Sequence, residues 1–83
     1  MTIYILQEQN IDHVNDNHSE IYTTIYRKYE AAHQNMTNSI NEIITGLKAD
    51  AYQPKLTKFD ESNIQIDTED NSYIFNIIED TLN

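Results

Sequence analysis

Apolar residues recur between residues 11 and 47 at the spacing of an α-helix. One line of mainly apolar residues covers 36 positions in ten steps, which is 3.6 residues per step. Further apolar and aromatic residues lie beside this line, so the stripe is wider than the seam of a coiled coil and suits packing against a sheet or several helices. We therefore predict one long helix, whose stripe consists of Ile11, Val14, His18, Ile21, Ile25, Tyr29, Ala32, Met36, Ile40, Ile43 and Leu47.

The predicted helix is long for a chain of 83 residues. From residue 12 to residue 49 it would span about 57 Å, whereas a globule of this size has a radius of gyration of about 12 Å. Either a second copy of the chain covers the protruding part, or the helix bends near residues 35–41, where weak helix formers cluster. A helical hairpin is one alternative, and a later start with Asp16 or Asn17 as the N-cap is another.

Strand-like runs flank the predicted helix. Residues 2–7 are rich in β-branched and aromatic types and predict an N-terminal strand. Gly46 and Pro54 predict that the helix ends between them, because proline cannot continue a helix. After this connector, residues 56–59 predict a short strand or a docking loop.

The C-terminal residues predict a β-hairpin. Residues 63–67 alternate between polar and apolar types, residues 67–72 are polar, and residues 73–78 form a second apolar arm. The second arm also fits a helical line, so strand and helix both remain open for it. The expected fold class is α+β, with an N-terminal strand, one long helix that is straight or bent, and a C-terminal β-hairpin, all within a single small acidic domain of residues 1–83.

The net charge of −9 is concentrated near the C-terminus, since residues 60–83 hold seven acidic residues and no Lys or Arg. Such a field repels nucleic acids and anionic membranes and attracts basic protein surfaces. The chain has no cysteine, which excludes disulfides and thiolate zinc sites and fits a reducing cytoplasm. Its N-terminal apolar run is too short for a signal peptide or a membrane span, so we expect a cytoplasmic protein.

Acidic residues form two candidate partner-binding groups. Three carboxylates spaced four residues apart would form one ridge on the predicted helix, although acids near a helix N-terminus are also favourable against its dipole. The second group lies around the predicted hairpin and its tail. The candidate binding residues are Asp12, Asp16 and Glu20 on the helix, and Asp67, Glu69, Asp70, Glu79 and Asp80 around the hairpin.

Catalytic and metal-binding patterns are weak in this sequence. The three histidines match no standard zinc spacing, and residues 67–78 lack the glycine and the twelfth-position glutamate of a calcium loop. Tyr22, Tyr26 and Tyr29 fit a packed or interface position better than a nucleic-acid stacking platform, because Arg27 and Lys28 alone cannot make a basic groove. We therefore expect no enzymatic activity, no metal and no cofactor.

The small size, the acidic segment from Asp60 to Asp80 and the acidic ridge make the chain similar to small acidic proteins encoded by bacteriophages, among them anti-CRISPR proteins and other DNA mimics. Ten Asn, thirteen Ile and one Gly also indicate an AT-rich coding sequence, as in low-GC bacteria and their mobile elements. The resemblance implies an inhibitor that blocks a host nuclease or its DNA-recognition surface, without catalysis and without a cofactor. The alternatives are an antitoxin, immunity or adaptor protein that binds a basic partner, and a structural homodimer formed through the long helix.

Overall fold

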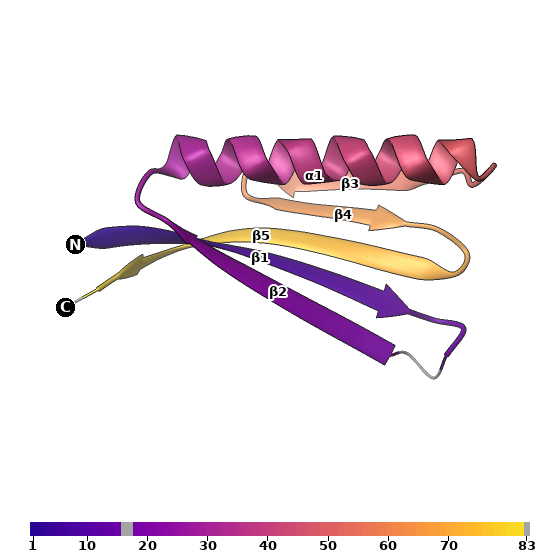
Figure 1. Cartoon of the computed structure of the whole chain (residues 1–83), viewed down its shortest axis with the longest axis horizontal. Helices are drawn as coiled ribbons and strands as arrows, with labels where there is room; N and C mark the ends of the chain where they lie inside the picture. The colour runs from indigo at the N-terminus through magenta and orange to yellow at the C-terminus, as the bar shows by residue number, and fades with distance from the viewer. Residues whose placement is uncertain (16–17, 83) are drawn as a thin grey trace.

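The two ends of the chain pair with each other in the middle of an antiparallel sheet. The structure, a computed structural model, describes residues 1–15 and 18–82. Within these residues the elements follow in the order β1 (Thr2–Asp12), β2 (His18–Tyr26), α1 (Tyr29–Ala49), β3 (Lys55–Asp60), β4 (Asn63–Asp67) and β5 (Asn71–Thr81). The strand order is β2-β1-β5-β4-β3, so the N-terminal and C-terminal strands are neighbours (Figure 1). Their pairing extends from Thr2 opposite Thr81 to Asp12 opposite Asn71.

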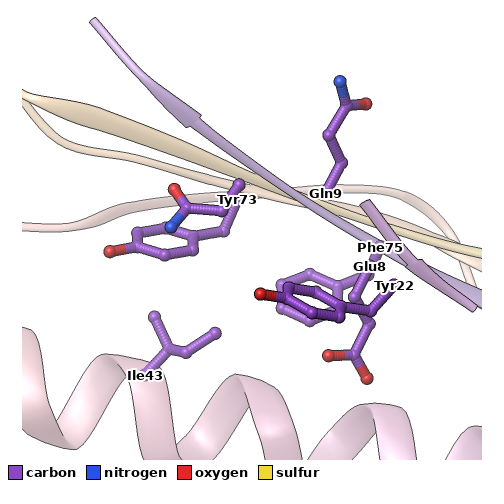
Figure 2. A pocket seen from close by; sticks show the side chains of 7 residues that line it. Glu8, Gln9, Tyr22, Ile43, Tyr73 and Phe75 are labelled. Atoms are coloured by element: carbon purple, nitrogen blue, oxygen red, sulfur yellow. The ribbon is translucent and has the colours of Figure 1, made fainter. Parts of the chain in front are cut away.

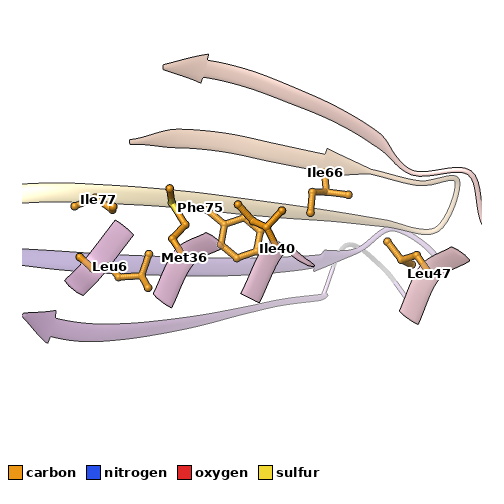
Figure 3. Close-up of a cluster of buried hydrophobic side chains, with 8 residues drawn as sticks. Leu6, Met36, Ile40, Leu47, Ile66, Phe75 and Ile77 are labelled. Atoms are coloured by element: carbon orange, nitrogen blue, oxygen red, sulfur yellow. The ribbon is translucent and has the colours of Figure 1, made fainter. Parts of the chain in front are cut away.

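Helix α1 covers one face of this sheet (Figure 1). Its buried residues recur at helical spacing. Together with apolar side chains from the sheet they form one buried cluster (Figure 3). At 1.5 Å per residue the 21 residues of α1 span about 32 Å, within the molecule's longest extent of 44 Å. The buried cluster comprises Leu6, Ala32, Met36, Ile40, Leu47, Ile66, Phe75 and Ile77.

The predicted helix is wrong in its first half. Residues 18–26 form β2, which pairs with β1 over nine positions from Tyr4–Tyr26 to Asp12–His18. The run from Ile21 to Tyr26 consists only of β-branched and aromatic residues, which favour strands, and pairing with β1 outweighs the helical period. The arrangement of one N-terminal strand, one long helix and a C-terminal hairpin is therefore corrected to a five-stranded sheet with one helix.

The second half of the predicted helix is confirmed. Helix α1 is continuous through residues 35–41, so the helical hairpin is wrong, and it ends at Ala49, between Gly46 and Pro54. Its N-cap is Lys28, which makes no side-chain capping bond. The capping residues considered from the sequence, Asp16 and Asn17, lie outside the described residues.

The predicted strands at the two ends of the chain are present. The N-terminal strand is longer than expected and continues to Asp12. Residues 73–78 belong to β5 rather than to a helix, and β4 and β5 form the expected hairpin with Asp67 opposite Ser72. Residues 56–59 lie in β3, which pairs with β4 at one edge of the sheet.

Candidate protein-binding surfaces

Two turns that are far apart in the sequence lie side by side at one end of the sheet. The β1–β2 turn follows Asp12, and the β4–β5 turn precedes Asn71, the residue opposite Asp12 in the register. The backbone N–H of His13 donates a hydrogen bond to the carbonyl oxygen of Asp70, with an N···O distance of 2.8 Å. This pairing gathers the carboxylates of Asp12, Asp67, Glu69 and Asp70, and we call these four residues the acidic end.

A buried serine fixes one carboxylate of the acidic end. Ser72 is only 7% exposed, and its hydroxyl donates to Oδ1 of Asp67 at 2.7 Å. The amide of Gln65 donates to the same oxygen at 2.9 Å. Nε2 of His13 lies 2.8 Å from the Ser72 hydroxyl, which connects this network to the β1–β2 turn. The hydrogen bonds from Gln65 and Ser72 lower the pKa of Asp67 below its usual value, so its carboxylate stays charged at neutral pH.

Hydrogen bonds from two different segments hold Asp12 and Asp70 in place. Oδ1 of Asp12 accepts the backbone N–H of Val14 at 2.9 Å, and its Oδ2 accepts the side-chain amide of Asn15 at 2.7 Å. These bonds lower the pKa of Asp12, with the Asn15 amide as the largest cause. Oδ2 of Asp70 accepts the hydroxyl of Tyr52 at 2.8 Å, which raises the pKa of Tyr52 and attaches the segment after α1 to the acidic end.

The negative charge of the acidic end is not neutralised by an ion pair within the described residues. The ion pairs found there join Glu20 to His18 and Glu61 to both His33 and Lys58. Lys55 lies opposite Asp67 in the β3–β4 register and favours its charged form. Glu69 is exposed in the β4–β5 turn, so this end presents carboxylates to solvent.

The structure separates the remaining predicted binding residues from the acidic end. Glu79 and Asp80 lie opposite Tyr4 and Ile3, near the N-terminus, and the nine residue steps from Asp70 to Glu79 correspond to about 30 Å. Glu20 lies on the edge strand β2, where its carboxylate accepts the hydroxyl of Tyr22 at 2.8 Å. The predicted helical ridge does not exist, because Asp12 and Glu20 belong to two strands. Asp16 lies outside the described residues.

A groove of about 180 Å³ opens between the helix and the sheet, and it is lined by residues of β1, β2, β5 and α1. Figure 2 shows Glu8, Tyr22, Tyr73 and Phe75 on the side of the sheet that faces α1, whereas Gln9 points away from the helix. Oε1 of Glu8 accepts the Ser39 hydroxyl at 3.3 Å. Oδ1 of Asn10, which also lines the groove, is buried and has no hydrogen-bond partner among the described residues.

The sheet face opposite the helix is rich in exposed isoleucine. Strand side chains alternate between faces, and Leu6 faces the helix, so its neighbours Ile5 and Gln7 and their cross-strand partners face the other way. Ile25 is 64% exposed, Ile21 is 54% exposed and Ile78 is 45% exposed. We call this surface the open face and define it by Ile5, Gln7, Gln9, Ile21, Thr23, Ile25, Ile74, Asn76 and Ile78.

The open face does not follow from the predicted helix, because Ile21 and Ile25 belong there to a buried helical stripe. Two signals in the sequence fit the strand instead. The residues at 21, 23 and 25 are all β-branched, as are the alternating residues at 3, 5 and 11 of β1, and residues 15–17 (Asn-Asp-Asn) are typical of a turn. A period of two therefore fitted this stretch as well as a period of 3.6.

The described residues show neither a metal-binding group nor a helix suited to crossing a membrane. Among residues 1–15 and 18–82, no group of His, Cys, Asp or Glu is arranged to hold a metal ion. No helix in this part of the chain combines the length and the apolar character that crossing a bilayer requires. In the comparisons with known proteins, no family model, curated protein or solved structure matches the chain.

Proposed function

We propose that this protein is a non-enzymatic, cytoplasmic inhibitor that binds the basic nucleic-acid-binding surface of a host protein, such as a nuclease. The observation that supports this proposal is the hydrogen bond from His13 to Asp70, which joins two turns and gathers the four carboxylates of the acidic end. In a chain with a net charge of −9, this end would attract a basic surface and orient it on approach.

The chemistry of the acidic end fits a site that normally binds phosphate. Arg and Lys side chains that contact phosphate oxygens also bind carboxylates, and Arg does so with two parallel hydrogen bonds. The hydrogen bonds that lower the pKa values of Asp12 and Asp67 also restrain these carboxylates before a partner arrives. Binding then costs less side-chain entropy than it would for free surface carboxylates. In the proposed mechanism the protein occupies the partner's DNA site, as phage-encoded DNA mimics and anti-CRISPR proteins do.

Two pairs of adjacent acidic residues allow a matched test of this mechanism. The double variant Glu69→Lys with Asp70→Lys reverses two charges at the acidic end. The control, Glu79→Lys with Asp80→Lys, reverses the same number and type of charges at the opposite end of β5. Wild type and both variants are immobilised and exposed to a lysate of a low-GC bacterium, and the captured proteins are identified by mass spectrometry after washes at low and high salt.

We expect the wild type and the control variant to capture the same DNA-binding protein, and the variant at the acidic end to lose it. High salt and added duplex DNA should both release the partner, because the contacts are charged and the DNA competes for the same site. Equal loss in both variants would show that only total charge matters and would refute a localised site. A partner that duplex DNA does not displace would instead support the antitoxin, immunity or adaptor alternative.

A further inference from the structure

The open face carries two mainly apolar rows and one polar row across three strands. Ile25, Ile5 and Ile78 lie next to one another on β2, β1 and β5. Gln9 lies on β1 four residues after Ile5. Its neighbours across the sheet are Ile21 on β2 and Ile74 on β5, and these two isoleucines make the second row mainly apolar. Between these rows lies a polar row that consists of Thr23, Gln7 and Asn76. Exposed apolar side chains that adjoin one another in this way indicate an interaction surface rather than scattered surface residues.

No residue of the open face is charged, although the whole chain has a net charge of −9 and the same side of the sheet carries Asp80 near the end of β5 and Lys55 and Asp67 on β3 and β4. Repulsion between like charges opposes self-association of such a chain, and it is weakest where no carboxylates meet. A basic partner finds no carboxylates to bind on this face. A second copy of the chain meets no repulsion between carboxylates there. We propose that the open face is the interface of a homodimer in which two sheets pack face to face. This proposal is independent of the proposed inhibitor function.

The row pattern of the open face is complementary to itself. A two-fold axis in the plane of the sheet, directed either along β1 or along the polar row, places apolar rows on apolar rows and the polar row on its own copy. The side-chain amide of Gln7 holds donors and an acceptor, so it can bond to the Gln7 amide of the second copy, which two facing carboxylates could not do. The Asn76 amide donates to Oδ1 of Asn63 at 2.8 Å within the chain and keeps a second N–H for the polar row of the other copy. Two aligned sheets pack in this manner at a separation of about 10 Å.

The open face has the size of a small protein interface. Strands β1, β2 and β5, at a spacing of about 4.8 Å and with an average length of about 34 Å, give a flat footprint of roughly 490 Å². The side chains make the accessible area larger than this footprint, which corresponds to the weak interfaces that bury up to about 600 Å² per partner. The helix offers no comparable surface, because Ala32, Met36, Ile40 and Leu47 are already buried against the chain's own sheet. The homodimer through the long helix that the sequence suggested is therefore not the arrangement proposed here.

The dimer is tested by sedimentation equilibrium of the purified full chain across the micromolar range. Ile25→Asp and Ile78→Asp each place a charge inside the proposed interface, once from each copy, and should weaken dimerisation by at least about 100-fold. Both residues are largely exposed in the single chain, so the variants should retain the far-ultraviolet circular dichroism of the wild type. Leu56→Asp is the matched control, because Leu56 is 51% exposed on β3 but lies opposite Ile66, on the helix-facing side.

The wild type and Leu56→Asp should both be dimers. The conservative variant Ile25→Val should also remain a dimer, because it keeps the apolar contact that Ile25→Asp removes. High salt should leave the dimer intact or strengthen it, because its contacts are apolar. High salt should weaken the binding of a basic partner at the acidic end. The dimer proposal and the inhibitor proposal can therefore fail separately. A wild type that stays monomeric at every concentration would overturn the proposal. Unchanged dimers of both Ile25→Asp and Ile78→Asp would also overturn it, as would a Leu56→Asp variant that dissociates to the same extent.

Discussion

Met36 is the most direct test of how the helix and the sheet hold this fold together. Its side chain is fully buried in the cluster between α1 and the sheet (Figure 3). Met36→Ala removes this apolar volume, and the surrounding side chains on two rigid elements can close the cavity only in part. Buried large-to-Ala substitutions of this kind cost about 2–5 kcal/mol. A chain of 83 residues has a total stability of roughly 4–12 kcal/mol, so the variant should lose a large part of it.

The free energy of unfolding is measured by urea titration, followed by circular dichroism. The midpoint should fall while the m-value stays unchanged, and each kcal/mol lost should lower the melting temperature by about 4–8 °C in a domain of this size. Thr45→Ala is the control, because Thr45 is exposed on the same helix and its replacement should change stability by less than about 0.5 kcal/mol. A loss below about 1 kcal/mol for Met36→Ala would refute the packing of α1 on the sheet.

Two further predictions concern α1 and the β3–β4 turn. Gly46→Ala should raise the free energy of unfolding by about 0.5–1 kcal/mol in the same titration. The reason is that a Cβ at this helical position meets no atom within 4 Å. A loss of stability would contradict the open space around Gly46. Asp60 accepts hydrogen bonds from the Asn63 side-chain amide and the Ser62 backbone, which lower its pKa from 3.8. Because the folded pKa is below the unfolded one, the stabilisation is complete above pH 3.8 and is lost as the pH falls through the folded value. The difference in urea midpoint between wild type and Asp60→Ala should therefore shrink on acidification below this pH, and a constant difference would show that the carboxylate charge is not involved.

Local signals in the sequence were sufficient for the elements whose neighbours in space are also neighbours along the chain. The spacing of Ala32, Met36 and Ile40 predicted the helix that is present, and Gly46 and Pro54 located its end. The alternation around Ile64 and Ile66, followed by a polar turn, predicted the β4–β5 hairpin. In each of these cases hydrogen bonds within the helix or across one short turn satisfy the backbone, so the pattern does not depend on distant residues.

Residues 18–26 and the acidic end depended on contacts that no local pattern contains. The run from Ile21 to Tyr26 fits both a helical stripe and a strand, and pairing with β1 decides between them. Asp12 and Asp70 lie 58 positions apart and meet only because β1 and β5 pair along their whole lengths. The same pairing moves Glu79 and Asp80 to the opposite end. The sequence by itself determined an acidic α+β chain with one helix and a C-terminal hairpin, because composition and local backbone bonding are properties of short segments. Only the tertiary structure decided which carboxylates share a surface and which isoleucines remain exposed, because the register between the two ends of the chain sets both.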